Sequence, residues 1–361
     1  MQTEEYSQVK KRSLAAFSQV FKEQPTVFEL TPIGVKDEWL GKVSPKTGIF
    51  RYHLEFPSGF TTDFVGKWKS RRIILDGARV ICAGDPLLFA QQLLNRKIFG
   101  FNDCEKRENT FYRNVSRTLS EHFPNLYWAV ASKNGTEFLA LEEIKGAKKP
   151  NPADFFKIID TITDFHAKYY GKTSAAAQLG LNIYTENDYK RAKNTLLSMW
   201  RKHNSQNIVI FTTQELEKIE NFIKNIDQER AKLPKKHQTL THNDFSRRNI
   251  FIKNGKVIIF DWEMACWQNP EHDFVELLTF DLEKLTDKDI ILLVKRFRAQ
   301  LSKKTGKKLT DKEYFALIRY NLLEFAVNKM SILRAFNVGR NIPTINRLPK
   351  NVARLIRIFG I

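Results

Sequence analysis

The sequence predicts an α+β protein of two lobes, an antiparallel β-sheet followed by a mostly helical part. From Val27 to about Ile144 the pattern is mostly that of strands, whereas apolar residues beyond the linker KGAKKPNPAD recur at three- and four-residue spacing. A chain of 361 residues with 42% hydrophobic residues and 28 Phe is long enough for two lobes with real cores. We therefore expect a folded rather than a disordered chain.

The strand pattern begins as an antiparallel meander. Residues 49–56, IFRYHLEF, and 62–68, TDFVGKW, alternate apolar and polar side chains on either side of the turn Pro57-Ser58-Gly59. A preceding strand is expected near residues 38–43.

Two helices and a hairpin complete this part. Residues 1–25 read as a helix that ends at Pro25, and residues 103–122 read as a second helix with an apolar stripe. The runs LYWAVAS and TEFLALEEI then flank Lys133-Asn134-Gly135, and Asn-Gly is a strong hairpin signal. The predicted order is three strands, a helix and two strands.

The second part is mainly helical. Helices are predicted over 153–170, 186–203 and 213–231, and another runs from Thr310 towards Phe336. The capping boxes Thr212-x-x-Glu215 and Thr310-x-x-Glu313 open two of them. A hairpin, NIFIKN and KVIIFDW, turns at Asn254-Gly255. We expect a helical extension at 1–28, a nucleotide-binding N-lobe of five strands and one helix at 29–144, and a C-lobe at 145–361.

Composition excludes several classes of protein. Cys82, Cys104 and Cys266 are far apart and form no CxxC pair, so neither a disulfide framework nor a zinc site is expected. The N-terminal residues MQTEEYSQVKKR lack the apolar core of a signal peptide, and no apolar run approaches the ~18 residues that span a bilayer. A soluble, cytoplasmic protein without a transmembrane segment is expected.

The charge is unusual and local. The net charge is +19, and residues 284–361 carry 18 Lys or Arg against 5 Asp or Glu. This distribution fits a solvated basic helical surface or a patch for an anionic partner. Both interpretations stay open from the sequence.

A polar cluster flanks the second hairpin. Phosphoryl transfer requires an oriented acceptor hydroxyl, Mg²⁺ bridging the phosphates and a lysine that holds them. His242-x-Asp244-x4-Asn249, in THNDFSRRN, has the spacing of the kinase catalytic loop, with Asp as base and Asn as metal ligand. Asp261 follows a buried run and supplies the second candidate ligand.

With these motifs the chain resembles the aminoglycoside phosphotransferase and choline kinase-like family, which shares the protein-kinase fold. The resemblance rests on THNDFSRRN, IIFDWE, PEHDFVELL and DFHAKYYG, and its topology extends from about residue 29 to the end. It implies a bilobal protein-kinase-like fold and an ATP-dependent kinase with Mg²⁺. The nucleotide, ATP or GTP, is left open.

The resemblance implies a role for each motif residue. Asp244 is similar to the base that accepts the acceptor-hydroxyl proton, and Asn249 and Asp261 are similar to the Mg²⁺ ligands. His242 resembles the packed histidine that braces the loop, and Asp273 resembles the aspartate that hydrogen-bonds the loop backbone.

Glu263 stands where a protein kinase has the Gly of its DFG motif. This difference is typical of the small-molecule branch. It favours a small-molecule kinase over one that acts on protein, and so does the lack of an APE-like segment or an activation loop between Asp261 and Asp273.

The phosphate-binding lysine of the family sits on the third strand. Lys67 and Lys69 share one face with Val65, and Lys67 is preferred because it directly follows the apolar run. Its expected helix partner is Glu108, with Glu105 as the fallback.

Two further nucleotide-binding segments are expected. The hinge that binds the base resembles LALEEI, at Glu142, Glu143 and Ile144. No GxGxxG precedes Lys67, so the phosphate loop is assigned to SPKTG, with Ser44 and Thr47 as donors and Gly48 allowing close backbone approach.

The acceptor itself has no motif in the sequence. The basic C-terminal third would repel polycationic acceptors such as aminoglycosides, so a neutral or anionic hydroxylated metabolite is expected. Arg247 and Arg248 are candidate contacts to a phosphate or to the acceptor. The alternative is a kinase-like binding protein whose basic face docks on nucleic acid or an acidic membrane. That face would include Arg340, Arg347, Arg354 and Arg357.

Overall fold

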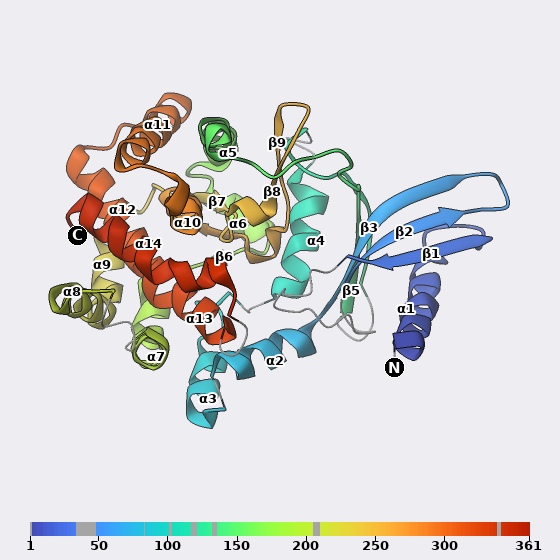
Figure 1. Cartoon of the computed structure of the whole chain (residues 1–361), viewed down its shortest axis with the longest axis horizontal. Helices are drawn as coiled ribbons and strands as arrows, with labels where there is room; N and C mark the ends of the chain where they lie inside the picture. The colour runs from blue at the N-terminus through green and yellow to red at the C-terminus, as the bar shows by residue number, and fades with distance from the viewer. Residues whose placement is uncertain are drawn as a thin grey trace.

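The structure is a computed structural model that describes residues 2–33, 48–82, 84–100, 103–116, 121–131, 136–204, 210–337 and 341–361. Its β-sheet lies at one end of the molecule and most helices at the other, so that the two chain termini lie far apart (Figure 1). The elements are α1 (Gln2–Phe17), β1 (Val27–Pro32), β2 (Gly48–Glu55), β3 (Thr61–Ser70), α2 (Arg71–Ile81), α3 (Pro86–Leu94), α4 (Cys104–Asn114), β4 (Leu126–Ala131), β5 (Thr136–Leu141), α5 (Phe155–Tyr169), α6 (Thr173–Gln178), β6 (Asn182–Ile183), α7 (Glu186–Asn204), α8 (Thr213–Lys224), α9 (Ile226–Ala231), β7 (Thr239–Thr241), β8 (Ile250–Lys253), β9 (Lys256–Ile259), β10 (Cys266–Gln268), α10 (Glu271–Asp281), α11 (Asp287–Thr305), α12 (Asp311–Phe325), a π-helix (Ala326–Met330), α13 (Ser331–Asn337) and α14 (Pro343–Phe359).

Within the described ranges, β1 to β5 form a five-stranded antiparallel sheet in the order β1-β2-β3-β5-β4. In β3, Phe64 and Trp68 are buried on the outer face beneath α1. Because side chains alternate along a strand, Lys67 and Lys69 project from the opposite face. That face turns towards α4 and the helical lobe, and it is therefore where the sheet can supply charged side chains to a site between the lobes.

Helix α1 covers the outer face of the sheet. Phe17, at its C-terminal end, is 1% exposed. Its ring contacts the rings of Phe28, Tyr52, Phe64, Trp128 and Phe138. These aromatic side chains form a compact core of the N-terminal lobe, and α1 is part of that core rather than a detached extension.

The inner face of the sheet belongs to the main core. Leu139 and Leu141 of β5 pack into the same buried cluster as the helices of the C-terminal lobe. Helix α4 joins the two parts, because the Phe111 ring stacks on Trp262 with 4.0 Å between ring centroids. This contact brings α4 against the segment that carries Asp261 and Glu263.

The predicted hairpins and caps are confirmed. The β4 and β5 strands pair, as do β8 and β9, and both capping boxes, at Thr212 and at Thr310, are present. The helix predicted over 213–231 divides into α8 and α9 at Asn225. The helix from Thr310 towards Phe336 contains a π-helical turn at Ala326–Met330. The strand expected at 38–43 lies outside the described residues.

The expectation of mostly strand between Val27 and Ile144 is wrong in one region. Residues 71–81 and 86–94 form α2 and α3, which insert between β3 and α4. Helix α2 packs against α13, and a Cβ at Gly77 would lie 3.3 Å from the Phe336 ring. The run RRIILDGARVI places Ile74, Ala78 and Ile81 at helical spacing, so the local pattern did indicate α2, whereas its packing partner lies more than 250 residues further along the chain.

No helix in the ranges that the structure describes is long and apolar enough to cross a membrane.

Replacing Phe17 by Ala tests whether α1 belongs to the N-lobe core. Removing this buried ring leaves a cavity among five aromatic neighbours, so the free energy of unfolding should fall by roughly 3–5 kcal/mol. Urea unfolding followed by tryptophan fluorescence measures the change. Phe315→Ala is the matched control, since that side chain is 50% exposed, and it should cost less than about 0.5 kcal/mol. Equal costs for the two variants would contradict the packing of α1.

Candidate active site

The loop between β7 and β8, residues 242–249, is held by two carboxylates of α10. Asp273 accepts hydrogen bonds from the backbone N–H groups of His242 and Asn243, both at 2.9 Å. Glu276 accepts the N–H of Phe245 at 2.7 Å. Buried N–H groups need acceptors, and these carboxylates supply them. The loop backbone is thereby fixed to the most buried helix of the lobe.

Asp273 is fully buried and also accepts from His166 Nε2 at 2.9 Å. Burial by itself would raise the pKa of Asp273, but the hydrogen bonds from His166 and from the backbone N–H of His242 lower it below its usual value. His166, expected to be a satisfied core histidine, is buried and hydrogen-bonded. Asp273 therefore acts on the loop as an ionised acceptor.

His242 lies beneath the loop with no exposed surface. Its Nε2 donates to the carbonyl oxygen of Phe260 at 2.9 Å, and its Nδ1 accepts the N–H of Asp244 at 3.2 Å. These partners assign the neutral tautomer with the proton on Nε2. The ring also packs 4.5 Å from that of Trp262. The contacts are those of a brace between the loop and the end of β9.

Asp244 projects from the loop with its two carboxylate oxygens held separately. Lys329 Nζ lies 3.0 Å from Oδ1, and Asn249 Nδ2 donates to Oδ2 at 2.8 Å. Arg248 Nη2 is 3.6 Å from Oδ1. Burial would raise the pKa of Asp244, but the positive charges of Lys329 and Arg248 together place it well below its usual value. Asp244 is thus a charged carboxylate at neutral pH.

Asp261 follows β9 in a left-handed backbone conformation, with φ 67° and ψ 56°. This conformation is uncommon outside Gly, although Asp and Asn adopt it more readily than other residues, and such positions are frequent at functional sites. Lys67 Nζ contacts Asp261 Oδ1 at 2.6 Å and Glu108 Oε2 at 2.9 Å. Burial would raise the pKa of Asp261, but Lys67 and Lys69 hold it below its usual value. Lys67 therefore links the sheet, α4 and the segment after β9.

Lys69 makes a parallel set of contacts. Its Nζ lies 2.6 Å from Glu108 Oε2 and 2.7 Å from Glu263 Oε2. The two lysines thus share Glu108, which is 1% exposed, while each contacts a different carboxylate after β9. The side chain of Glu105, the fallback partner, lies outside the part of the chain that the structure describes.

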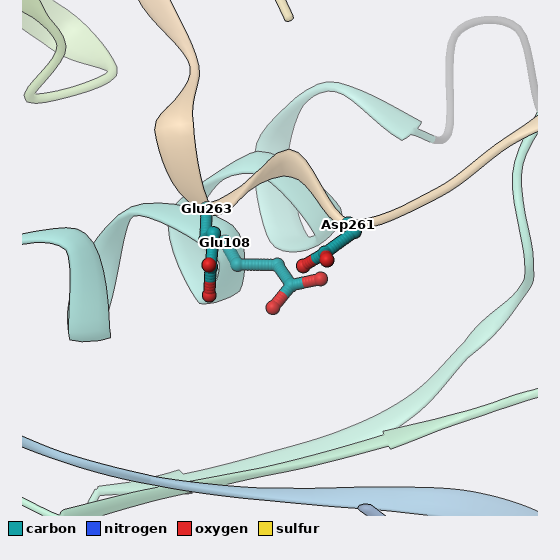
Figure 2. Close-up of side chains that lie close together, drawn as sticks. All are labelled: Glu108, Asp261 and Glu263. Atoms are coloured by element: carbon teal, nitrogen blue, oxygen red, sulfur yellow. The ribbon is translucent and has the colours of Figure 1, made fainter. Parts of the chain in front are cut away.

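Glu108, Asp261 and Glu263 each offer a carboxylate oxygen within 4.8 Å of the others. Figure 2 shows them converging from α4 and from the segment after β9. Carboxylate oxygens suit Mg²⁺, and Asp261 and Glu263 are partly open to solvent, so these two fit a hard divalent cation, whereas Glu108 is 1% exposed and is held by both lysines. The Asn249 amide nitrogen faces Asp244, which turns its amide oxygen, the atom able to bind a metal, away from that residue.

The hinge follows β5. The Glu142 N–H donates to Asn125 O at 2.8 Å, and Glu143 pairs with Arg51 at 2.6 Å. Glu142 and Ile144 line a cavity of about 290 Å³ together with residues 121–125 and the β8–β9 hairpin.

The predicted phosphate loop is described only in part, because Ser44 and Thr47 lie outside the described residues. Gly48 opens β2 with φ 157°, and a Cβ there would lie 2.6 Å from the Phe50 ring.

The two arginines of the loop differ in their surroundings. Arg247 pairs with Asp281 through Nε and donates to Pro150 O, so its side chain ties the loop to α10 and to the linker. Arg248 is 43% exposed, lies over the Phe280 ring and faces Asp244. Only the second of these two side chains is placed beside the candidate base.

The basic C-terminal region is partly neutralised. Arg347 pairs with Glu283, Arg354 with Asp287 and Arg357 with Glu215. Arg340 lies beyond the described residues. The charges serve in part to fasten α14 to neighbouring segments, and an anionic partner for this surface stays a prediction.

Sequence reasoning missed two charged residues of the site. Lys329 lies 85 residues after Asp244, and Glu276 stands on a helix whose residues are all buried. Glu276 occurs in the motif PEHDFVELL, so a polar residue within an otherwise buried run was an available signal. Lys329 had none, because nothing near it in sequence belongs to a catalytic motif.

The comparisons with known proteins identify the family. The profile of the phosphotransferase enzyme family matches residues 106–301, and the chain belongs to that family. The resemblance seen in the motifs is therefore confirmed. No curated protein matches the chain by sequence.

Two solved structures share the fold. The choline kinase LicA from Streptococcus pneumoniae is 11% identical over 97% of this chain and 98% of its own, with a TM-score of 0.55. The choline kinase from Cryptosporidium parvum Iowa II is 12% identical over 98% and 96%, with a TM-score of 0.53. At such low identity they show the kinase-like fold, and the expected α+β bilobal architecture is confirmed.

Asp273→Asn should destabilise the protein by roughly 3–5 kcal/mol at pH 7, because an amide cannot replace a buried carboxylate that accepts from three donors. The pKa of Asp273 is lowered in the fold, so its stabilisation is present above the unfolded value of about 3.9 and is lost as the pH falls through the folded value. The stability gap between wild type and variant should therefore narrow below about pH 4.

Urea unfolding at a series of pH values between 3 and 7 measures this gap. Asp311→Asn is the control, since Asp311 is 81% exposed and pairs only at the surface with Arg298; its effect should stay below about 1 kcal/mol. A gap for Asp273→Asn that is constant across this pH range would contradict the ionised state of Asp273.

Proposed function

We propose that the protein is an ATP-dependent small-molecule kinase that transfers the γ-phosphate to a hydroxyl group of a neutral or anionic metabolite. The observation that carries the proposal is the bridge from Lys67 to both Glu108 and Asp261, formed next to a loop that presents Asp244. These are the parts that phosphoryl transfer requires, in one place. The family membership supports the reaction class.

In this proposal Asp244 receives the proton of the acceptor hydroxyl. The acceptor oxygen forms its bond to the γ-phosphorus while the bond from that phosphorus to the leaving ADP oxygen breaks. A carboxylate with a lowered pKa is a weak base, but phosphoryl transfer depends mainly on positioning and charge stabilisation. The main role of Asp244 is therefore to orient the hydroxyl, with proton acceptance late in the step.

The remaining groups hold the nucleotide. Lys67 binds phosphate oxygens, and Glu108 keeps its ammonium in position. Asn249 and Asp261 hold Mg²⁺, which when bound neutralises charge on the phosphates. Glu263 lies close enough to Asp261 to assist.

Two segments complete the nucleotide site. The backbone of Glu142, Glu143 and Ile144 binds the base, which is ATP's adenine unless the protein uses GTP. Ser44, Thr47 and Gly48 cover the phosphates from the loop before β2. These assignments rest on the family resemblance and on the place of the hinge at the end of β5.

The charges around Asp244 favour a neutral or anionic acceptor. Lys329 and Arg248 flank its carboxylate, and the nearby carboxylates of Glu276 and Asp261 are themselves paired with lysines. A polycationic acceptor would meet like charges at the transfer site. The two structural relatives are choline kinases, and choline carries a single positive charge. The acceptor proposed for this protein is neutral or anionic, so the proposal differs from these relatives in the charge of the acceptor.

Asp244→Asn should lower turnover by roughly 10² to 10⁴, because the amide lacks the negative charge that orients the hydroxyl and later accepts its proton. The measurement is ADP formation from Mg·ATP across a panel of hydroxylated metabolites, with the variant as the blank. A metabolite that gives equal ADP formation with both proteins would remove Asp244 from the mechanism.

Nucleotide binding provides the control. Mg·ATP should raise the melting temperature of the wild type and of Asp244→Asn alike, whereas Asp261→Ala should abolish the Mg²⁺-dependent part of that shift. A shift unchanged in Asp261→Ala would separate Asp261 from the metal. Salt-sensitive oligonucleotide binding with no nucleotide-dependent shift would instead favour the binding-protein alternative.

Kanamycin should be a poor acceptor, with kcat/KM at least about 10²-fold below that of a neutral or anionic acceptor found in the panel, because its ammonium groups would lie beside Lys329 and Arg248. The same ADP assay measures it, at low and at high salt. Rapid ATP-dependent phosphorylation of kanamycin would overturn the proposed acceptor class while leaving the kinase activity intact.

A further inference from the structure

Lys329 reaches the candidate base from a distant part of the chain. Its Nζ lies 2.6 Å from the carbonyl oxygen of Asn243, 3.0 Å from Asp244 Oδ1 and 3.2 Å from Glu276 Oε1. An ammonium has three N–H donors. The contact to Asn243 O is a hydrogen bond and the two carboxylate contacts are ion pairs, so the charge of Lys329 is directed at the catalytic loop and at the α10 carboxylate that holds it.

The group is largely withdrawn from water. The Lys329 side chain is 13% exposed, that of Glu276 is fully buried, and that of Asp244 is 21% exposed. Burying charges costs free energy that their attraction only partly returns, and apolar residues of similar size often stabilise a protein equally well. Stability is thus a weak reason for placing a lysine here, whereas a function at Asp244 is a direct one.

The backbone is shaped to deliver this side chain. Lys329 lies in the π-helical turn Ala326–Met330, between α12 and α13. A π-turn shifts the helix register, and such turns occur frequently at functional sites. Its neighbour Asn328 donates to Ile98 O at 3.1 Å and to Glu324 Oε1 at 2.9 Å, which anchors the turn on both sides.

We infer that Lys329 is a positioning residue for Asp244, which fixes one carboxylate oxygen while Asn249 fixes the other. With Oδ1 held by Lys329 and Oδ2 by Asn249, the plane of the carboxylate is set, and its remaining lone pairs point in defined directions towards the acceptor hydroxyl. The inference rests on the proposed function, because it assigns Asp244 the task of orienting that hydroxyl.

Lys329 also offsets negative charge near Asp244. A transferring phosphoryl group must approach the negatively charged Asp244, and Asp261 lies close enough for the two carboxylates to affect one another. Lys329 adds a positive charge on the acceptor side, just as Lys67 does on the nucleotide side. Preorganised charge of this kind stabilises the charge that develops in the transition state. Arg248 is a weaker candidate for this task, because it is more exposed and stands 3.6 Å away.

The test compares Lys329→Met, Lys329→Arg and the control Lys304→Met. Lys304 resembles Lys329 in its environment: it is 19% exposed, pairs with Asp164 at 2.8 Å and donates to a backbone carbonyl at 2.7 Å, but it lies on α11, which packs on α5 away from the loop. The probe is Mg·ATP with water as the acceptor, followed by phosphate release from the full chain. An acceptor from the metabolite panel is used in a parallel assay.

Lys329→Met should lower kcat about 10²-fold in both assays, the size expected when a reacting group is displaced or loses a preorganised charge. The KM for ATP should change less than about 3-fold, since the nucleotide contacts are elsewhere. Lys329→Arg should recover kcat to within about 10-fold of wild type, because it restores a donor and a charge. Lys304→Met should remain within about 2-fold.

Three outcomes would overturn the inference. Wild-type kcat in Lys329→Met would show that the lysine does not act through Asp244. A loss of melting temperature in Lys329→Met that exceeds that of Lys304→Met, together with no recovery in Lys329→Arg, would assign it a purely structural role. Wild-type turnover no greater than that of Asp244→Asn would reject the proposed function itself, and the inference with it.

Discussion

The rest of the site depends on the hydrogen bonds that the loop after β7 donates to the carboxylates of α10. Asp273 accepts the backbone N–H groups of His242 and Asn243, and His242 Nδ1 accepts that of Asp244, so three consecutive loop positions have a fixed backbone. Asn243 is held with φ 59°, a conformation a free loop would rarely keep. The turn aims the Asp244 side chain at solvent-accessible space while its backbone remains buried. The position of the Asp244 side chain therefore depends on buried backbone N–H groups having acceptors in the core.

Charge balance is the second constraint, and it works in the same way on both sides of the site. On the nucleotide side, Lys67 and Lys69 stand among three carboxylates; on the acceptor side, Lys329 stands between Asp244 and Glu276. A buried carboxylate without a partner would take up a proton instead of staying charged. In the proposed mechanism Lys329 and Lys67 therefore keep Asp244 and Asp261 ionised, and these acids in turn keep the two lysines charged despite their burial.

The sequence predicted what local chemistry determines. Asn254-Gly255 and the Thr212 and Thr310 caps act over a few residues, so the β8–β9 hairpin and the helix starts were accessible without the structure. The motif spacing brought Asp244 and Asn249 together because five residues separate them. The preferred lysine and its Glu108 partner followed from strand alternation combined with the family resemblance, and the structure places the two in contact at 2.9 Å.

What the sequence did not predict depends on contacts between remote segments. Helix α2 packs against α13, and this contact between remote segments could not be predicted, although Ile74, Ala78 and Ile81 stand at helical spacing. Two lysines of β3 can share Glu108 only if β3 and α4 lie close enough together, and the sequence does not give that distance. Lys329 joins the site only because a π-turn at the end of α12 faces a loop that precedes it by some 85 residues. Each of these features is tertiary, and residue propensity carries no information on it.

These contacts bear on the acceptor. In a kinase-like fold the nucleotide side is defined by the sheet, and here its lysines and carboxylates are largely paired with one another. The acceptor side is defined by the helical lobe, where Lys329 and Arg248 frame Asp244. Lys329 is hydrogen-bonded to Asn243 O and ion-paired with Asp244 and Glu276, so in the proposed mechanism it contributes charge more than contacts, whereas the Arg248 guanidinium is the more accessible of the two to a substrate. In the proposed mechanism the lysine that orients the base also sets the charge that an acceptor meets, so the two properties are coupled through Lys329.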